Sequence, residues 1–168
     1  MRFRPLLLAA GLCLLAVPAA AGCSDAAAPK VDWQDCILNE ASLAGADLAG
    51  ANIRAASFSS AALAKAILSE ADGRRVKMIA ADLAGANLDK ARFGDADFTR
   101  ADLSGTSLKG ADLRRARFFG ARLRSADLTG ARVEDADFFN ADLSGALWID
   151  GRLRCAEGSV GKCNRAPG

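Results

Sequence analysis

Large apolar residues recur at every fifth position of this chain from Trp33 to Leu153. Of the 25 positions at that spacing, 24 are large and apolar, and Gly73 is the exception. A small residue, nearly always Ala, stands two positions before each of them, and Gly often stands two positions after. A five-residue period fits neither a helix nor the two-residue alternation of a long strand. The pattern therefore predicts a short extended segment and a tight turn in every repeat.

The large residues also sort by composition when those 20 positions apart are read as columns. One column is rich in aromatic residues, two are almost entirely Leu, and the fourth is mixed. The aromatic column reads Leu38, Phe58, Met78, Phe98, Phe118 and Phe138. The mixed column reads Trp33, Ile53, Gly73, Phe93, Leu113, Val133 and Leu153. This sorting predicts that four repeats complete one circuit of a coil and that inward side chains stack in ladders.

Tandem repeats of the form A(D/N)LxG, such as Ala81–Gly85 and Ala101–Gly105, resemble the pentapeptide-repeat family. The resemblance covers residues 31–153 and implies an all-β fold, a right-handed quadrilateral β-helix (solenoid) of about six 20-residue coils. An uncovered end of such a solenoid exposes an apolar cross-section and open strand edges. We therefore expect capped ends, with residues 22–30 as an N-terminal cap and residues 154–168 as a C-terminal cap or tail.

The first residues have the pattern of a secretion signal. Arg2 and Arg4 precede an apolar stretch from Leu6 to Val17, and the small residues Ala19–Ala21 supply a cleavage site. The apolar stretch is shorter than the ~20 residues that a membrane-spanning helix needs. Residues 1–21 are therefore predicted to be a signal peptide, and the protein is predicted to be exported to the periplasm or secreted.

Cysteine use allows two readings of the processed chain. Cleavage after Ala21 leaves an even set in an oxidising compartment, which predicts local disulfides joining Cys23 to Cys36 and Cys155 to Cys163. Alternatively, residues 20–23 resemble a bacterial lipobox, in which Cys23 is lipidated and anchors the protein to the outer membrane. Ala20 stands where a lipobox usually has Leu, and lipidation would leave an odd number of thiols, so the disulfide reading is favoured. No other membrane insertion is expected.

Charge and composition argue against nucleic-acid binding and catalysis. Removing Arg2 and Arg4 from the 22 basic residues leaves 20, against 20 acidic residues, so the processed chain has a formal net charge of zero. Histidine is absent, and Ser59 and Ser60 have no activating partner at a recognisable spacing. We predict no enzyme activity, no cofactor, no metal and no nucleic-acid partner. The gyrase-protecting branch of the family consists of cytoplasmic, strongly acidic DNA mimics, an alternative that export and a neutral charge disfavour.

Charged residues 20 positions apart alternate in sign along two outward columns. The first column reads Asp72, Arg92, Asp112 and Arg132, and the second reads Lys77, Asp97, Arg117 and Asp137. Opposite charges on adjacent strands favour pairing. The columns therefore predict rows of exposed ion pairs that serve register and solubility more than stability.

Two aromatic residues break the polar pattern of the outer surface. Phe119 and Phe139 directly follow inward Phe118 and Phe138, and they fall in one outward column with Ile79. Adjacent exposed rings form a contact surface more readily than a solvated one. The alternative is that the rings lie flat along the wall or beneath a terminal segment. We predict a structural or protein-interaction scaffold that binds a protein partner or a second copy of itself.

The stretch from Gly73 to Lys77 is the second departure, because its inward side chain is missing. We expect Val76 and Met78 to fill the resulting gap. Arg74, Arg75 and Lys77 form a candidate weak basic patch for an anionic ligand. Pairing of these cations with Asp72 and Asp97 is the favoured alternative.

Overall fold

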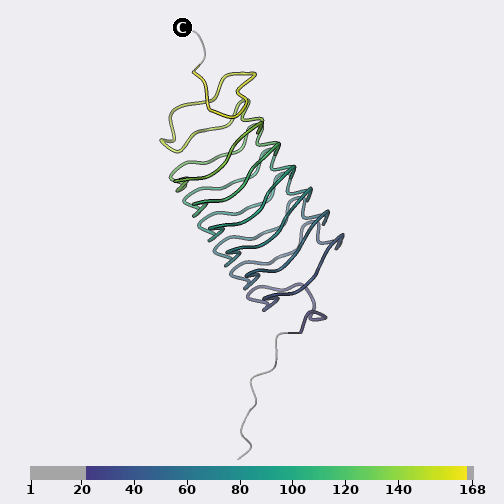
Figure 1. Cartoon of the computed structure of the whole chain (residues 1–168). Helices are drawn as coiled ribbons and strands as arrows, with labels where there is room; N and C mark the ends of the chain where they lie inside the picture. The colour runs from purple at the N-terminus through teal and green to yellow at the C-terminus, as the bar shows by residue number, and fades with distance from the viewer. Residues whose placement is uncertain (1–21, 166–168) are drawn as a thin grey trace, which may run out of the picture.

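The computed structural model describes residues 22–165, which stack into a rod whose N-terminal and C-terminal ends lie far apart (Figure 1). The predicted signal peptide, residues 1–21, lies outside the described residues, as do residues 166–168. The described chain contains no helix, and consists of single-residue β-bridges separated by turns. Accordingly, it offers no helical segment with the length and apolar character needed to cross a membrane.

Parallel β-bridges join residues that are 20 positions apart. Twenty such bridges are present in the described residues, from Asp32 with Asn52 to Asp127 with Leu147. Each circuit has four bridge positions, one per five-residue repeat, and the bridges are reinforced by backbone hydrogen bonds such as Phe118 N–H to Asp137 O, 2.7 Å. The prediction that residues one 20-residue circuit apart lie over one another is confirmed.

A tight turn closes every repeat. The N–H of the small residue donates to the carbonyl of the preceding large residue, as from Ala121 to Phe118 at 2.9 Å. The residue just before the small one has a positive φ in every repeat from Lys30 to Gly145, as the third residue of a type II turn does. Glycine meets this need in only some repeats, and Ala80, with φ of 55°, shows that the stacked hydrogen bonds hold other residues in the same strained conformation.

The interior is filled by the predicted ladders. Phe98 and Phe118 are fully buried and stack with ring centroids 5.1 Å apart and planes 5° apart. Phe118 and Phe138 continue the stack at 4.9 Å and 2°. Because each large side chain contacts its equivalent in the next circuit, burial of apolar surface and backbone pairing stabilise the same register.

The expected filling of the gap at Gly73 is wrong in one respect. Val76 and Met78 are buried, but the ring of Phe93 occupies the space above Gly73. A Cβ placed on Gly73 would lie 2.2 Å from Cε1 of that ring. Gly73 and Phe93 are neighbours in the mixed column, so a missing side chain in one circuit is matched by a large one in the next.

A disulfide-tethered segment begins the rod. Cys23 and Cys36 lie at bonding distance, with S–S 2.00 Å and Cα–Cα 5.5 Å, which is the pairing that the sequence predicts. Cys36 is buried in an inward small-residue position, while Cys23 lies in the exposed N-terminal segment. The disulfide therefore fastens residues 22–30 to the first circuit, where Trp33 is almost fully buried.

At the other end, the backbone leaves the coil earlier than the sequence repeat predicts. The five-residue pattern continues to Leu153, but parallel pairing stops at Leu147, and the chain then reverses. Antiparallel bridges join Leu147 to Arg154 and Asp142 to Val160. Cys155 and Cys163, at an S–S distance of 2.04 Å, close the reversed segment in the expected pairing. In Figure 1 this segment forms the yellow loops above the last circuit.

Candidate protein-contact surface

The outer aromatic pair lies near the C-terminal end of the rod. Phe119 is 38% exposed and Phe139 is 63% exposed, although neighbouring Phe118 is fully buried. The two outer rings stack on each other with centroids 5.9 Å apart and planes 20° apart. Ile79, two circuits below Phe119 in the same column, is half-buried. The structure thus brings Phe119 and Phe139 together as one accessible apolar surface, which we call the Phe pair.

A side-chain hydrogen bond fixes the backbone beneath Phe139. Its N–H donates to Oδ1 of Asp137 at 2.9 Å. The same bond from the fourth residue of a repeat to the second recurs elsewhere, as from Thr99 to Asp97 and from Ser104 to Asp102, both at 3.0 Å. Asp in the second position of the repeat therefore stabilises the turn. The backbone that carries Phe139 is held in the same way.

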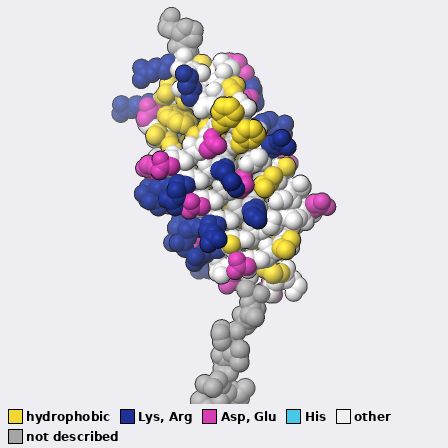
Figure 2. All heavy atoms as spheres, viewed as in Figure 1, with side chains coloured by type: hydrophobic (Ala, Val, Ile, Leu, Met, Phe, Trp, Pro, Cys, Tyr) yellow, Lys and Arg dark blue, Asp and Glu magenta, His cyan; other side chains and the backbone are white. Residues whose placement is uncertain are grey.

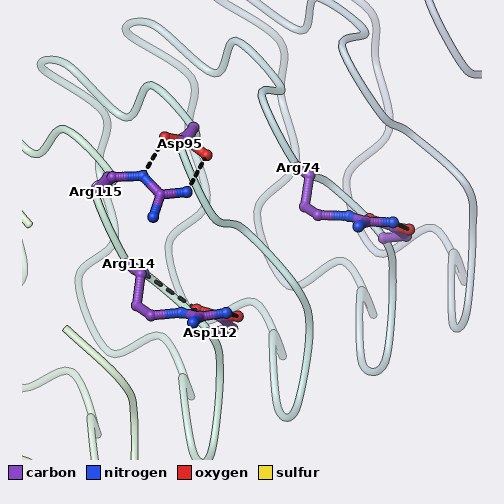
Figure 3. Close-up of polar contacts among 6 residues, drawn as sticks. Arg74, Asp95, Asp112, Arg114 and Arg115 are labelled. Atoms are coloured by element: carbon purple, nitrogen blue, oxygen red, sulfur yellow. Dashed lines mark hydrogen bonds and ion pairs between the residues drawn. The ribbon is translucent and has the colours of Figure 1, made fainter. Parts of the chain in front are cut away.

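Ion pairs within single repeats lie on the surface, and of these only the pairing of Arg74 with Asp72 was expected from the sequence. Arg74 Nε and Nη2 donate to the two carboxylate oxygens of Asp72 at 2.8 and 2.6 Å. Arg114 donates to both carboxylate oxygens of Asp112 through the same two nitrogens (Figure 3). These bonds hold the pKa of Asp72 and of Asp112 below the ordinary value of 3.8. The signal was an Asp and an Arg two positions apart, both of which point outward.

Ion pairs between neighbouring circuits are present at some of the positions that the columns of alternating charge predict. Arg117 Nη2 lies 2.7 Å from Asp97 Oδ2, and Arg92 Nη2 lies 3.3 Å from Asp72 Oδ2. A further bidentate pair, between Arg115 and Asp95, lowers the pKa of Asp95 through the hydrogen bonds from Arg115 (Figure 3). Basic and acidic side chains consequently lie side by side along the rod, with apolar side chains among them (Figure 2).

Of the three cations in the candidate basic patch, Arg74 alone forms an ion pair within residues 22–165. Arg74 is held by Asp72, as the favoured alternative predicts. Lys77 forms a β-bridge with Asp97, but the carboxylate of Asp97 pairs with Arg117 instead. Binding of an anionic ligand by Arg74, Arg75 and Lys77 stays a prediction. Across residues 22–165 no pocket opens, and no three potential ligands gather into a metal site.

Comparison with known proteins gives one clear result at the level of family. The family model for pentapeptide repeats matches in eight copies, over residues 23–54, 36–72, 56–95, 77–115 and 116–147. No curated protein sequence matches the chain.

Solved structures of other pentapeptide-repeat proteins resemble the chain. HetL of the cyanobacterium Nostoc sp. strain PCC 7120, described as involved in heterocyst differentiation regulation, is 28% identical, with 74% of this chain and 75% of HetL covered and a TM-score of 0.44. A protein of the Arabidopsis thaliana thylakoid lumen is 26% identical, with 65% and 84% covered and a TM-score of 0.37. QnrB1, a plasmid-mediated fluoroquinolone resistance protein, is 22% identical, with 67% and 65% covered and a TM-score of 0.29.

Proposed function

Because the chain belongs to the pentapeptide-repeat family, we propose that it is a non-enzymatic, extracytoplasmic scaffold that binds a protein through the Phe pair. The rod, in this proposal a right-handed quadrilateral β-helix of about six coils, supplies rigidity rather than chemistry. Its regular hydrogen-bond ladder holds outward side chains at fixed spacing, as the rings of Phe119 and Phe139 show. A rigid surface loses little conformational entropy when it binds a partner.

The observation that carries the proposal is the exposure of two aromatic rings that stack on each other on the outer surface of the rod. Burying a Phe side chain stabilises a complex by ~1.5–3 kcal/mol, and aromatic residues are enriched where binding energy concentrates. Phe139 is 63% exposed, so most of that stabilisation is still available to a partner. The inner ladder of Phe98, Phe118 and Phe138 already supplies the core, so stability of the rod does not require the outer rings.

Photo-crosslinking in living cells tests this proposal directly. A photoreactive phenylalanine analogue at position 139 should form a covalent adduct with a protein, and the same analogue at Ile37, exposed at the opposite end of the rod, should not. Absence of an adduct at position 139 would contradict the proposal.

Sedimentation tests whether the partner is a second copy. Changing Phe119 and Phe139 to Ser should abolish any self-association, whereas Ile67→Ser, at a position 38% exposed like Phe119, should leave it intact. An unchanged profile for the double variant would refute the homodimer version.

Export and processing are supported by the two disulfides, since such bonds persist in oxidising compartments. In this proposal residues 1–21 are removed, residues 22–30 and 154–168 cap the repeat domain, and the protein is periplasmic or secreted. The sulfur of Cys23 that bonds Cys36 is the atom that lipidation would require, so the soluble form is favoured. Intact mass spectrometry should find a protein lighter by four hydrogens than the reduced chain and without lipid, and a lipid on Cys23 would overturn this assignment.

A further inference from the structure

The C-terminal end of the rod is covered on only part of its circumference. The reversed segment pairs with one half of the last circuit, through Leu143 N–H to Ser159 O at 2.8 Å and Trp148 N–H to Leu153 O at 2.7 Å. The other half, residues 131–140, forms no β-bridge with a strand above it within the described chain, although Gly161 of the reversed segment lies against the backbone of Phe138 and Asn140 at its end. We call residues 131–140 the open edge.

Six backbone groups of the open edge point along the rod axis without a backbone partner in the part of the chain that the structure describes. They are the N–H groups of Val133, Asp135, Phe138 and Asn140 and the carbonyls of Ala131 and Ala136. One circuit below, the six equivalent groups are all paired, for example Leu113 N–H to Arg132 O at 2.8 Å. Unpaired edges of this kind are templates for adding another strand.

Apolar side chains along the open edge are also incompletely covered. Val133 and Phe138 are half-buried, whereas Leu113 and Phe118, their equivalents one circuit below, are fully buried. The Trp148 ring covers part of Phe138, which it meets edge-on with centroids 5.7 Å apart. The Phe pair ends at the same level, because Phe139 belongs to the open edge and its upper face has no further ring in the stack. An added strand would therefore bury apolar surface from the interior ladders and from the Phe pair together.

The charges of the open edge indicate what kind of strand fits it. Its charged residues are one cation, Arg132, and three anions, Glu134, Asp135 and Asp137, which sum to −2. None of these four forms an ion pair in the described structure. Arg115 and Arg117, in the circuit below, form ion pairs with Asp95 and Asp97 of the circuit beneath them and not with the open edge. The ladders that run through Arg115 and Arg117 end on the carboxylates of Asp135 and Asp137, so the next member of each of these two would be a cation, whereas the ladder through Asp112 ends on Arg132.

We propose that the open edge binds an extended, basic segment of a partner protein by β-strand addition, with an apolar side chain of that segment packed on Phe139. The proposal rests on the interaction-scaffold function and names the class of partner. The chain itself shows that the mode is feasible, because its own reversed segment already pairs antiparallel with the other half of the same circuit.

A second copy of this chain is a poor occupant on electrostatic grounds. Two open edges facing each other would bring together two surfaces of net charge −2. Head-to-tail stacking is disfavoured as well, because residues 31–53 carry four carboxylates and no Lys or Arg. Those carboxylates are Asp32, Asp35, Glu40 and Asp47. Like charges at both ends oppose the fibre formation to which open solenoid ends are otherwise prone.

The chain supplies a matched pair of probe peptides. Residues 111–120, which underlie the open edge, carry three Arg and one Asp, a net charge of +2, whereas residues 131–140 carry a net charge of −2. Both sequences contain the Phe-Phe pair and the same repeat spacing. Terminally blocked peptides of these two sequences therefore differ chiefly in charge.

The experiment is an NMR titration of the whole protein with each peptide. The 111–120 peptide should bind at least about tenfold more tightly than the 131–140 peptide, because two gained ion pairs replace two like-charge contacts. Binding should slow hydrogen exchange at the amides of Val133, Asp135, Phe138 and Asn140, and leave Leu43, near the opposite end, unchanged. Equal binding of both peptides, or no change at the four edge amides, overturns the proposal.

A double variant, Asp135→Asn with Asp137→Asn, separates charge from folding. Asn already fits both turn positions, because Asn87 Oδ1 accepts an N–H in the second position of its repeat and Asn140 adopts φ of 58° in the fifth. The variant should weaken binding of the 111–120 peptide about tenfold, and undiminished binding overturns the electrostatic assignment. If neither peptide binds while crosslinking at position 139 persists, strand addition is refuted and the scaffold function stands. Self-association that requires the open edge would equally refute a basic partner.

Discussion

Replacing Gly73 with Ala tests how closely successive circuits are packed. Gly73 does not have a positive φ, so the backbone conformation of the turn does not require glycine at this position. The Cβ of Ala would lie 2.2 and 2.4 Å from Cε1 and Cδ1 of Phe93, where ordinary contact is 3.4–4 Å. Phe93 is fully buried and meets Phe98 edge-on at 5.4 Å, so displacement of its ring would disturb neighbouring core side chains.

Overpacking of this kind costs ~1–3 kcal/mol. Since more than 1 Å of separation must be opened between fully buried side chains, we expect Gly73→Ala to lower the free energy of unfolding by about 3 kcal/mol. Equilibrium urea denaturation followed by circular dichroism measures the change, and the slope of the transition should be conserved.

Two further variants make the steric explanation refutable. Gly94→Ala is the matched control, because its Cβ would lie 3.7 Å from the nearest atom and its φ is not positive, so it should change stability by less than about 0.5 kcal/mol. Phe93→Leu should rescue Gly73→Ala, with a coupling of about 1 kcal/mol or more in a double-mutant cycle. The reasoning is refuted if Gly73→Ala costs no more than Gly94→Ala.

Three other outcomes follow from the same structure. Phe118→Ala should destabilise the protein by ~3–5 kcal/mol, because it removes a fully buried ring between two stacked neighbours. Phe119→Ala should cost less than about 1 kcal/mol, because the Phe119 side chain is 38% exposed. Equal losses of stability in thermal melts would show that the inner and outer rings are misassigned. Changing both Cys155 and Cys163 to Ser should lower stability by ~2–3 kcal/mol and raise protease sensitivity in residues 148–165, which limited proteolysis with mass spectrometry can locate. Acid should destabilise the rod, because Arg74 and Arg114 hold the pKa of Asp72 and Asp112 below 3.8. The stability that these pairs contribute is complete above pH 3.8 and is lost as the pH falls through the lower pKa of the folded state. Asp72→Asn should therefore reduce the acid sensitivity of the melting temperature.

Much of the fold could be predicted from sequence because a five-residue period is self-repeating. Once four repeats form a circuit, the aromatic and Leu columns follow from the spacing alone, and Phe98 stacks on Phe118 as expected. The disulfide pairing was accessible for a similar reason, since Cys13 lies within residues 1–21, and among the remaining cysteines Cys23 and Cys155 each have one cysteine near in sequence. These features depend on position along the chain.

The features that sequence reasoning missed depend on competition between neighbours. Asp72 has two cations within reach, and whether Arg74 or Arg92 binds it more closely depends on side-chain geometry that no spacing reveals. The reversal after Leu147 was hidden because Leu153 keeps the repeat phase although the backbone has already turned back. The open edge follows from that reversal, since a chain that leaves the coil early covers only half of the last circuit.

Amide hydrogen exchange of the free protein tests the central claim of a stacked coil that ends on an open edge. The amides of Leu113, Arg115, Phe118 and Gly120 are paired with the last circuit and should exchange slowly, whereas those of Val133, Asp135, Phe138 and Asn140 should exchange rapidly. A contrast between positions one circuit apart is the predicted result. Equal protection of the two sets would contradict the account, because it would mean that another strand already covers residues 131–140.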